Sequence, residues 1–213
     1  MYKISTLSKS LVSGAVLSLA LFSANTFAGP GKPGKNGIKD GGNIVDVAVE
    51  ANALLGEFDY LLGAVGCFTD EETGYNPIVD LLTGSDKLTL FAPTDAAFEN
   101  LQGVLGVPEE DRAPEVTCAV DSILGEGTLF TVLAYHLTDG RRFSNSVFNQ
   151  NNSKQIDMLA GGYITTNASL TIIDGFPQVI TPQLPLIDIN ASNGVIHVID
   201  TVMLPFNPFA GEE

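Results

Sequence analysis

The sequence predicts an α+β domain in which an antiparallel β-sandwich is flanked by several α-helices. Between residues 44 and 137, apolar residues return every three or four positions, which is the spacing of amphipathic helices. Beyond Asp139, charge falls away and short β-branched segments alternate with Gly, Asn, Asp and Pro, as is typical of antiparallel sandwiches. No internal repeat is visible in the 213 residues, and the length that remains after an export signal fits one domain.

Residues 1–28 have the composition of a secretory signal peptide. Basic residues precede an apolar core from Leu11 to Phe22, and small side chains at Thr26 and Ala28 occupy the positions that a signal peptidase reads. A transmembrane helix needs about 20 apolar residues, which is more than this core provides. We therefore expect cleavage between Ala28 and Gly29, no membrane span, and export to the periplasm, the cell surface or the medium.

Residues 29–42 form a Gly, Pro and Lys linker with almost no apolar side chains, and we expect this linker to be disordered. The chain has 10 basic and 25 acidic residues; cleavage removes Lys3 and Lys9, which leaves 8 basic residues and a formal charge of −17. So acidic a surface repels phosphate backbones and anionic lipid headgroups. Nucleic acid is therefore disfavoured as a partner.

The helical half of the chain contains recognisable start and stop signals. Asn43 is placed as an N-cap, and Thr94 or Asp95 can cap the helix after Pro93, because each side chain can accept a hydrogen bond from a first helical turn. We expect one or two helices over Ile44–Val65 broken near Gly56, a short helix over Ile78–Leu82, a strand over Leu88–Phe91 followed by a helix through Leu101, and helices over Val116–Leu137 broken around Gly125–Gly127.

The strand-rich half of the chain ends in a predicted hairpin. Leu184–Asn190 and the β-branched run after Gly194 predict two antiparallel strands joined by a turn at Ala191–Gly194, because an Asn-Gly pair readily adopts positive φ angles. The last run is apolar on both faces, which indicates a central strand covered on both sides. Further strands are expected over Ile156–Leu159, Tyr163–Thr166, Ser169–Ile173 and Phe176–Ile180.

Three segments of the chain carry a family resemblance. They are LTLFAPTDAAFENL at Leu88–Leu101, the Tyr135-His136 pair inside VLAYHL, and NGVIHVIDTVMLP at Asn193–Pro205. In this order they resemble the signature segments of the fasciclin-type domain over roughly residues 43–205, with residues 206–213 as a frayed tail. The resemblance implies a wedge-shaped sandwich flanked by helices, secreted or at the cell surface, used in adhesion or matrix contact and without general enzymatic activity.

The resemblance also marks individual residues. It implies a hydrogen-bonded contact between His136 and the strand-to-helix corner at Thr94 and Asp95. Tyr135 and His136 resemble a motif that is linked in animal members to receptor contact; the alternative for Tyr135 is interior packing with a bonded hydroxyl. The family-motif residues are Thr94, Asp95, Tyr135, His136, Asn193, Gly194 and His197.

The sequence indicates no catalytic, cofactor-binding or metal-binding residue. The chain has two histidines, His136 and His197, and neither lies in a close-spaced ligand motif. We expect both to be structural, because a buried imidazole needs hydrogen-bond partners and strand neighbours offer them. No Ser stands in a G-x-S-x-G context, although a Ser-His-Asp triad could assemble from distant segments.

Cys67 and Cys118 are predicted to form a disulfide. An exported chain meets an oxidising compartment, and both residues lie near the ends of predicted helices. Free thiols are the alternative, because the spacing by itself defines no geometry.

These observations predict a secreted, non-catalytic adhesion or interaction module of the fasciclin type. Its partner would be an extracellular protein or polysaccharide, bound on the sandwich surface. The first alternative is a periplasmic or surface protein that binds a small ligand or glycan in a pocket between sheet and helices. The second alternative is a hydrolase with a triad assembled from distant segments.

We predict that the mature protein begins at Gly29. Intact-mass analysis of the exported protein should give the mass of residues 29–213, because a signal peptidase cleaves after the second of two small residues spaced as Thr26 and Ala28 are. Exported protein that retains Lys3 would contradict this assignment.

Overall fold

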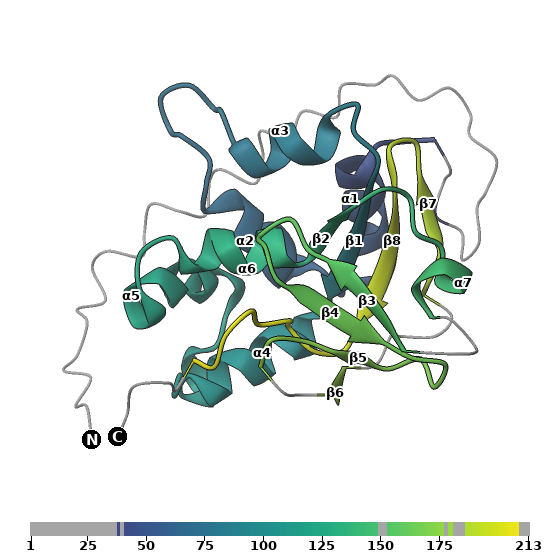
Figure 1. Ribbon diagram of the computed structural model, residues 1–213. Coiled ribbons are helices and arrows are strands. Elements are labelled where there is room, and N and C mark those ends of the chain that lie inside the picture. The colour runs from purple at the N-terminus through teal and green to yellow at the C-terminus, as the bar shows by residue number, and fades with distance from the viewer. Residues whose placement is uncertain (1–37, 39–40, 149–152, 177–178, 181–185, 209–213) are drawn as a thin grey trace.

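The computed structural model describes Ile38 and residues 41–148, 153–176, 179–180 and 186–208 (Figure 1). The predicted signal peptide and most of the predicted linker lie outside these residues, so both remain predictions. In Figure 1 most of the helices lie to the left of the two longest strands, and a second group of strands lies in the lower foreground.

Helices fill the first half of the described chain and strands the second, as predicted. The helices are α1 (Ile44–Leu55), α2 (Asp59–Gly66), α3 (Pro77–Thr83), α4 (Asp95–Val104), α5 (Val120–Leu124), α6 (Thr128–Tyr135) and α7 (Ser144–Val147), with 3₁₀ turns at Glu109–Asp111 and Pro114–Ala119. The strands are β1 (Leu88–Pro93), β2 (Leu137–Asp139), β3 (Lys154–Asp157), β4 (Tyr163–Thr166), β5 (Ile172–Ile173), β6 (Val179–Ile180), β7 (Ile189–Ala191) and β8 (Gly194–Ile199). The predicted break is confirmed at Gly56, which ends α1 with a φ of 64°.

Polar side chains start two of the helices where the sequence places them. Asn43 caps α1 reciprocally: its side chain accepts the Asp46 N–H at 3.0 Å, and the Asp46 carboxylate accepts the Asn43 N–H at 3.0 Å. Thr94 caps α4 by accepting a first-turn N–H at 3.3 Å. Asp95 has a different role, because its carboxylate accepts the Tyr60 N–H of α2 at 2.9 Å.

The first sheet has the strand order β2-β1-β8-β7, so β8 has a neighbour on each side. β8 is antiparallel to β7 but parallel to β1, from Leu88 opposite Gly194 to Pro93 opposite Ile199. The α+β class is confirmed, but the prediction of antiparallel pairing is wrong for this one pair. Parallel neighbours need a long connection, and residues 94–193 supply it.

β8 is covered on both faces, as its two-sided apolar pattern predicted. All six of its residues are buried. Ile196 and Val198 face the main hydrophobic core, which contains apolar side chains of α1 to α4 and α6, whereas Ile199 faces a second core that contains side chains of the second sheet. Because apolar side chains pack against both faces of β8, its residues do not alternate between polar and apolar.

The second sheet has the order β3-β4-β5-β6 and is antiparallel throughout. It follows the alternation of a half-covered sheet, since Ile164 is buried against the second core while Tyr163 is exposed. One corner joins the two sheets, where the Thr138 hydroxyl of β2 donates to the Asp157 carbonyl of β3 at 2.7 Å.

Asn193, in the loop between β7 and β8, is 4% exposed and binds three backbone groups. Its Oδ1 accepts the Ile44 N–H at 2.9 Å, and its Nδ2 donates to the carbonyls of Leu82 at 2.7 Å and Gly84 at 3.1 Å. Asn193 and Gly194 do not have the positive φ angles that the sequence predicted for this turn. Asn193 instead joins the hairpin to the start of α1 and the end of α3.

Gly194 is required by a close approach rather than by its backbone conformation. A Cβ atom at this position would lie 2.5 Å from the Leu88 carbonyl oxygen and 2.5 Å from Cδ1 of Ile44. The Leu88 oxygen belongs to the neighbouring strand and cannot move aside. Glycine therefore lets β8 enter the sheet directly beneath α1.

The predicted disulfide between Cys67 and Cys118 is confirmed, with a Cα–Cα distance of 5.6 Å. It joins the end of α2 to the 3₁₀ turn before α5. The sequence separation is 51 residues, and closing a loop of this length in the unfolded chain stabilises the fold by roughly 4 kcal/mol in the entropy model.

Within the described part of the chain, no single helix is long and apolar enough to cross a membrane. Val116–Leu124 and Thr128–Tyr135 meet the requirements of length and composition only together, across a bend of 111°.

We predict that Asn193→Ala lowers the free energy of unfolding by about 2 to 4 kcal/mol, because the substitution leaves buried backbone groups without their partners. Urea unfolding of the disulfide-bonded protein at pH 7 measures the loss. Ser192→Ala is the matched control, because Ser192 is the exposed residue of the same loop and its substitution should change stability by less than about 0.5 kcal/mol. Equal losses in the two variants would show that the Asn193 amide does not anchor the hairpin.

Candidate functional site

A short segment, Gly140–Ser144, crosses one face of the first sheet between β2 and α7; we call it the strap. Thr89 of β1 holds its beginning, because the Thr89 hydroxyl donates to the Gly140 carbonyl at 2.7 Å and accepts the Arg142 N–H at 2.8 Å. Thr89 and His197 are both fully buried, and the register between β1 and β8 places them on the same face. This face thus offers polar side chains to the backbone that crosses it.

His197 binds the middle of the strap. Its Nε2 lies 2.7 Å from the Arg142 carbonyl oxygen, and its Nδ1 lies 3.3 Å from the Asp188 nitrogen. Because a carbonyl can only accept, Nε2 carries the proton and Nδ1 accepts the Asp188 N–H. Burial lowers the pKa of His197, and the Arg142 carbonyl and the Asp188 carboxylate offset this only in part, so the ring is neutral at pH 7.

Asp188 holds the end of the strap. One of its carboxylate oxygens accepts the Ser144 N–H and the other accepts the Ser144 hydroxyl, both at 2.6 Å. Asp188 has a φ of 61°, a conformation that Asp tolerates better than most residues with a side chain. These bonds and the Asp188 N–H bond to His197 hold the residue in that conformation and fix the first residue of α7.

Ser144, Asp188 and His197 are the three residue types of a hydrolase triad, but their order in space differs from that of a triad. The Ser144 hydroxyl donates to Asp188, and Nε2 of His197 donates to a backbone carbonyl. In a triad the histidine accepts the proton of the serine. His197 does not face Ser144 in this way, so the three residues fix the strap and do not form a nucleophile with its base.

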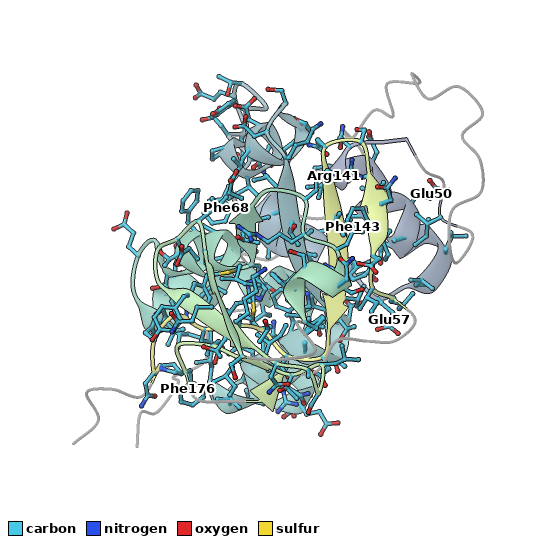
Figure 2. All side chains as sticks on the ribbon, turned by 45° about the vertical axis from the view of Figure 1, so that its right-hand side comes forward. Glu50, Glu57, Phe68, Arg141, Phe143 and Phe176 are labelled. Carbon is cyan, nitrogen blue, oxygen red and sulfur yellow. A yellow bond between two sulfur atoms is a disulfide. The ribbon has the colours of Figure 1, made fainter. Side chains whose placement is uncertain are left out.

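The strap presents Arg141 and Phe143 to solvent, beside the β7–β8 hairpin (Figure 2). The guanidinium carbon of Arg141 lies 5.6 Å from the centre of the Phe143 ring, and Arg141 also donates to the side-chain oxygen of Asn190 in β7. Lys87, just before β1, donates to the Ser192 carbonyl at 3.1 Å. This end of the first sheet therefore has a cationic and aromatic surface.

His136, at the end of α6, is 1% exposed and binds two backbone groups. Its Nδ1 lies 2.7 Å from the Val132 carbonyl oxygen, and its Nε2 accepts the Met203 N–H at 2.9 Å, so the proton is on Nδ1. Burial lowers the pKa of His136 to about 4. The implied contact with the Thr94–Asp95 corner is wrong, because both ring nitrogens bind elsewhere and join α6 to the segment after β8.

The corner at Thr94 and Asp95 contacts other elements. The Thr94 N–H donates to the Ile199 carbonyl at 3.1 Å, and the Asp95 N–H donates to the Glu57 carbonyl at 2.9 Å. Burial raises the pKa of Asp95, and hydrogen bonds from the backbone of Tyr60 and its neighbour lower it again in part. The corner thus attaches α4 to the end of β8 and to the start of α2.

Tyr135 is an interior residue. It is 1% exposed, packs in the second core, and its hydroxyl donates to the Tyr163 carbonyl of β4 at 2.8 Å. Burial, together with the nearby Asp174 carboxylate, raises the pKa of Tyr135 to about 12. The side chain holds the second sheet against α6 and is not available for a surface contact.

The described residues include no group of three or more His, Cys, Asp or Glu side chains that could hold a metal ion. An apolar cavity of about 40 Å³ lies among α1, α2, α3 and α6, lined by residues such as Leu61, Leu82 and Leu90. Sites for small organic ligands usually have volumes of about 300 to 1,000 Å³. His136 also lines this cavity, and both of its nitrogens are already bonded. The cavity is therefore a small void and not a ligand pocket of the predicted kind.

His197 was marked by the sequence, but its hydrogen-bond partners Arg142 and Asp188 were not, and neither was Thr89, the other buried side chain that binds the strap. One signal was present, since Thr89 and His197 are polar residues inside apolar strands. The position of Arg142 above β8 depends on the path of the chain between two sheets, for which the sequence carried no local signal.

The fold and the site define an α+β sandwich domain in which buried polar side chains hold a surface segment by its backbone. The family model named Fasciclin domain matches residues 73–205. The chain therefore belongs to the fasciclin domain family, whose members are in general adhesion-related.

Two relatives come from Synechocystis sp. The chain is 33% identical to Protein sll1483 over 128 residues, which cover 60% of this chain and 61% of that protein. It is 31% identical to Uncharacterized protein sll1735 over 162 residues, which cover 76% and 97%. The chain thus spans less than two thirds of the first relative. Among solved structures, a FAS1 domain pair from the insect cell adhesion molecule fasciclin I matches 72% of this chain and 49% of that chain, with 14% identity and a TM-score of 0.43.

We predict that His136 makes the domain sensitive to acid. Its pKa is about 4 in the folded state, against about 6.5 in an unfolded chain. Between these values the unfolded state binds a proton that the folded state does not, so the stability contributed by neutral His136 is complete above pH 6.5 and is lost as the pH falls toward 4. The loss amounts to about 3 kcal/mol.

The comparison variant is His136→Gln, because glutamine offers a donor and an acceptor but does not titrate. Urea unfolding at pH 7 should show the wild type to be more stable, and the difference should shrink by about 3 kcal/mol at pH 4. Titrations of all other groups cancel in this difference. A difference that stays constant from pH 7 to pH 4 would mean that His136 does not titrate as its burial requires.

His136→Ala should be less stable than the wild type by about 1 to 3 kcal/mol at pH 7.

Proposed function

We propose that the protein is exported and acts as a non-catalytic adhesion module that contacts an extracellular protein or polysaccharide. The observation that carries this proposal is the strap. Its backbone is bound by Thr89, His197 and Asp188, while Arg141 and Phe143 point to solvent. A surface segment that is fixed by buried partners loses little conformational entropy on binding, which favours recognition.

The use of the two histidines supports a non-catalytic role. A general base needs a ring nitrogen within reach of a substrate proton. His136 and His197 are 1% and 0% exposed, and both nitrogens of each ring already bind protein groups. We therefore propose structural roles for both histidines and assign the function to the surface that they support.

Export is supported by the N-terminal sequence and by the disulfide. The first 28 residues have the charge pattern and small residues of a signal peptide, and disulfides persist in oxidising compartments outside the cytosol. We therefore propose that the protein works in the periplasm, at the cell surface or in the medium.

We also propose that the adhesion domain begins before the region that the family model matches. Ile44 of α1 is fully buried in the main core and its N–H is bound by Asn193. Ile38, which lies inside the predicted linker, is 2% exposed and belongs to the same core. These contacts support a domain that includes residues 43–205 and receives at least one apolar contact from further upstream.

The function is tested by coating beads with residues 29–213 and measuring their adhesion to cells of the producing organism. We expect adhesion above that of uncoated beads, and a several-fold reduction with Phe143→Ala, because exposed aromatic side chains contribute strongly to interfaces. Tyr163→Ala is the matched control, since Tyr163 is an exposed aromatic residue on the second sheet and its loss should have little effect.

Two results would contradict the proposal. Wild-type beads that adhere no better than uncoated beads would exclude an adhesive role, and equal effects of the two aromatic substitutions would exclude the strap as the contact surface.

A further inference from the structure

We infer that Lys87, Arg141 and Phe143 form a binding site for a polysaccharide that carries carboxylate groups, such as a polymer of uronic acids. The inference rests on the proposed adhesive function and names the class of partner that the strap would bind. The evidence lies in the distribution of positive charge, in the partners of the cations and in the geometry of Arg141.

The positive charges of the described residues are concentrated around the strap. The described basic residues are Lys87, Arg112, Arg141, Arg142 and Lys154. Arg141 and Arg142 belong to the strap, Lys87 lies next to its start because the Gly140 N–H donates to the Lys87 carbonyl at 2.6 Å, and Lys154 donates to the Ser146 carbonyl of α7. Four of the five thus surround one segment of a chain with 25 acidic residues.

The three cations nearest the strap donate their hydrogen bonds to neutral oxygens. Lys87 donates to the Ser192 carbonyl, Arg141 to the amide oxygen of Asn190, and Nε of Arg142 to the Asp139 carbonyl at 2.9 Å. A neutral acceptor orients a cation without cancelling its charge. These contacts therefore leave the surface attractive to an anion.

Arg141 is oriented for a carboxylate. One of its five N–H donors is used by Asn190, and its guanidinium carbon lies over the Phe143 ring, so two contacts restrict the direction of the remaining donors. A guanidinium matches a carboxylate through two parallel hydrogen bonds. Phe143 is 38% exposed, and its ring offers an apolar surface for the C–H face of a sugar ring. Carboxylate and sugar face are adjacent features of a uronic acid.

The remaining charges limit which polyanion can bind. Asp86 and Asp139 lie next to Lys87 and the strap in sequence, and the Asp188 carboxylate binds Ser144 at the end of the strap, so the local excess of positive charge is small. At the other end of β1, the Asp95 N–H donates to the Glu57 carbonyl, and the length of β1 places these two acids roughly 17 Å from Lys87. This distance exceeds the Debye length of about 8 Å at physiological salt, so Glu57 and Asp95 have little effect on an anion at the strap.

A site with only a few positive charges does not suit partners that need an extended cationic surface. Nucleic acids and anionic membranes require an extended positive face, which this acidic chain does not offer. A single flexible polysaccharide chain needs only a few charges at a time and can reach the strap alone. The charge pattern therefore favours a uronic acid polymer.

The test measures binding of residues 29–213, with the disulfide intact, to immobilised polygalacturonate. The variant Lys87→Gln with Arg141→Gln should bind about tenfold more weakly, the loss expected for two charge-assisted contacts. Arg112→Gln is the charge control: it removes one positive charge, half the change in the double variant, beside the end of α4, where Nε of Arg112 donates to the Val107 carbonyl. This control should bind like the wild type, and thermal melts establish that each variant is folded.

Further arms separate charge from sugar recognition. Neutral dextran should not bind, and Phe143→Ala should weaken binding to polygalacturonate but not to polyglutamate. Equal binding of dextran, or wild-type affinity of the Lys87 and Arg141 double variant, would overturn the inference. Stronger binding of polyglutamate would point to an acidic protein and would overturn it as well. If wild-type beads adhere to cells but polygalacturonate neither binds nor competes, this inference fails while the proposed function stands.

Discussion

The parallel pairing of β1 with β8 is the interaction on which the rest of the structure depends. It joins residues about 100 positions apart in six consecutive pairs, and every residue of both strands is buried. One face of the pair receives the helices and the other receives the second sheet and the strap. The pairing also brings Thr89 and His197 onto one face, so the two side chains that bind the strap depend on this register.

Buried polar groups are costly unless they are bonded, and in this domain their bonds fix the backbone. Asn193 holds the start of α1 and the end of α3, His136 holds the segment after β8, and His197 holds the strap. The hydrogen bonds of His136 and His197 also occupy the ring nitrogens that acid–base catalysis would use. A domain built in this way keeps surface segments such as the strap in defined positions.

Local structure was predictable because its causes lie within a few residues. The Asn43 cap, the break at Gly56, the Thr94 cap and the two-sided burial of β8 all follow from neighbours in sequence. The turn at Asn193 was placed correctly but for a different reason: the amide binds distant backbone groups, and Gly194 is needed because Leu88 and Ile44 leave no room for a side chain.

The sequence by itself determined the α+β class, the order of most helices and strands, the disulfide partners and the acidic charge of the chain, but it did not predict β2 or α7. The tertiary structure decided that β1 and β8 pair in parallel, that His136 binds Met203, and that the Gly140–Ser144 strap crosses the sheet above His197. The physical reason is the range of the forces involved. Helix capping and apolar periodicity act between near neighbours, whereas strand pairing and the bonds of buried polar groups join residues that become neighbours only after the chain has folded.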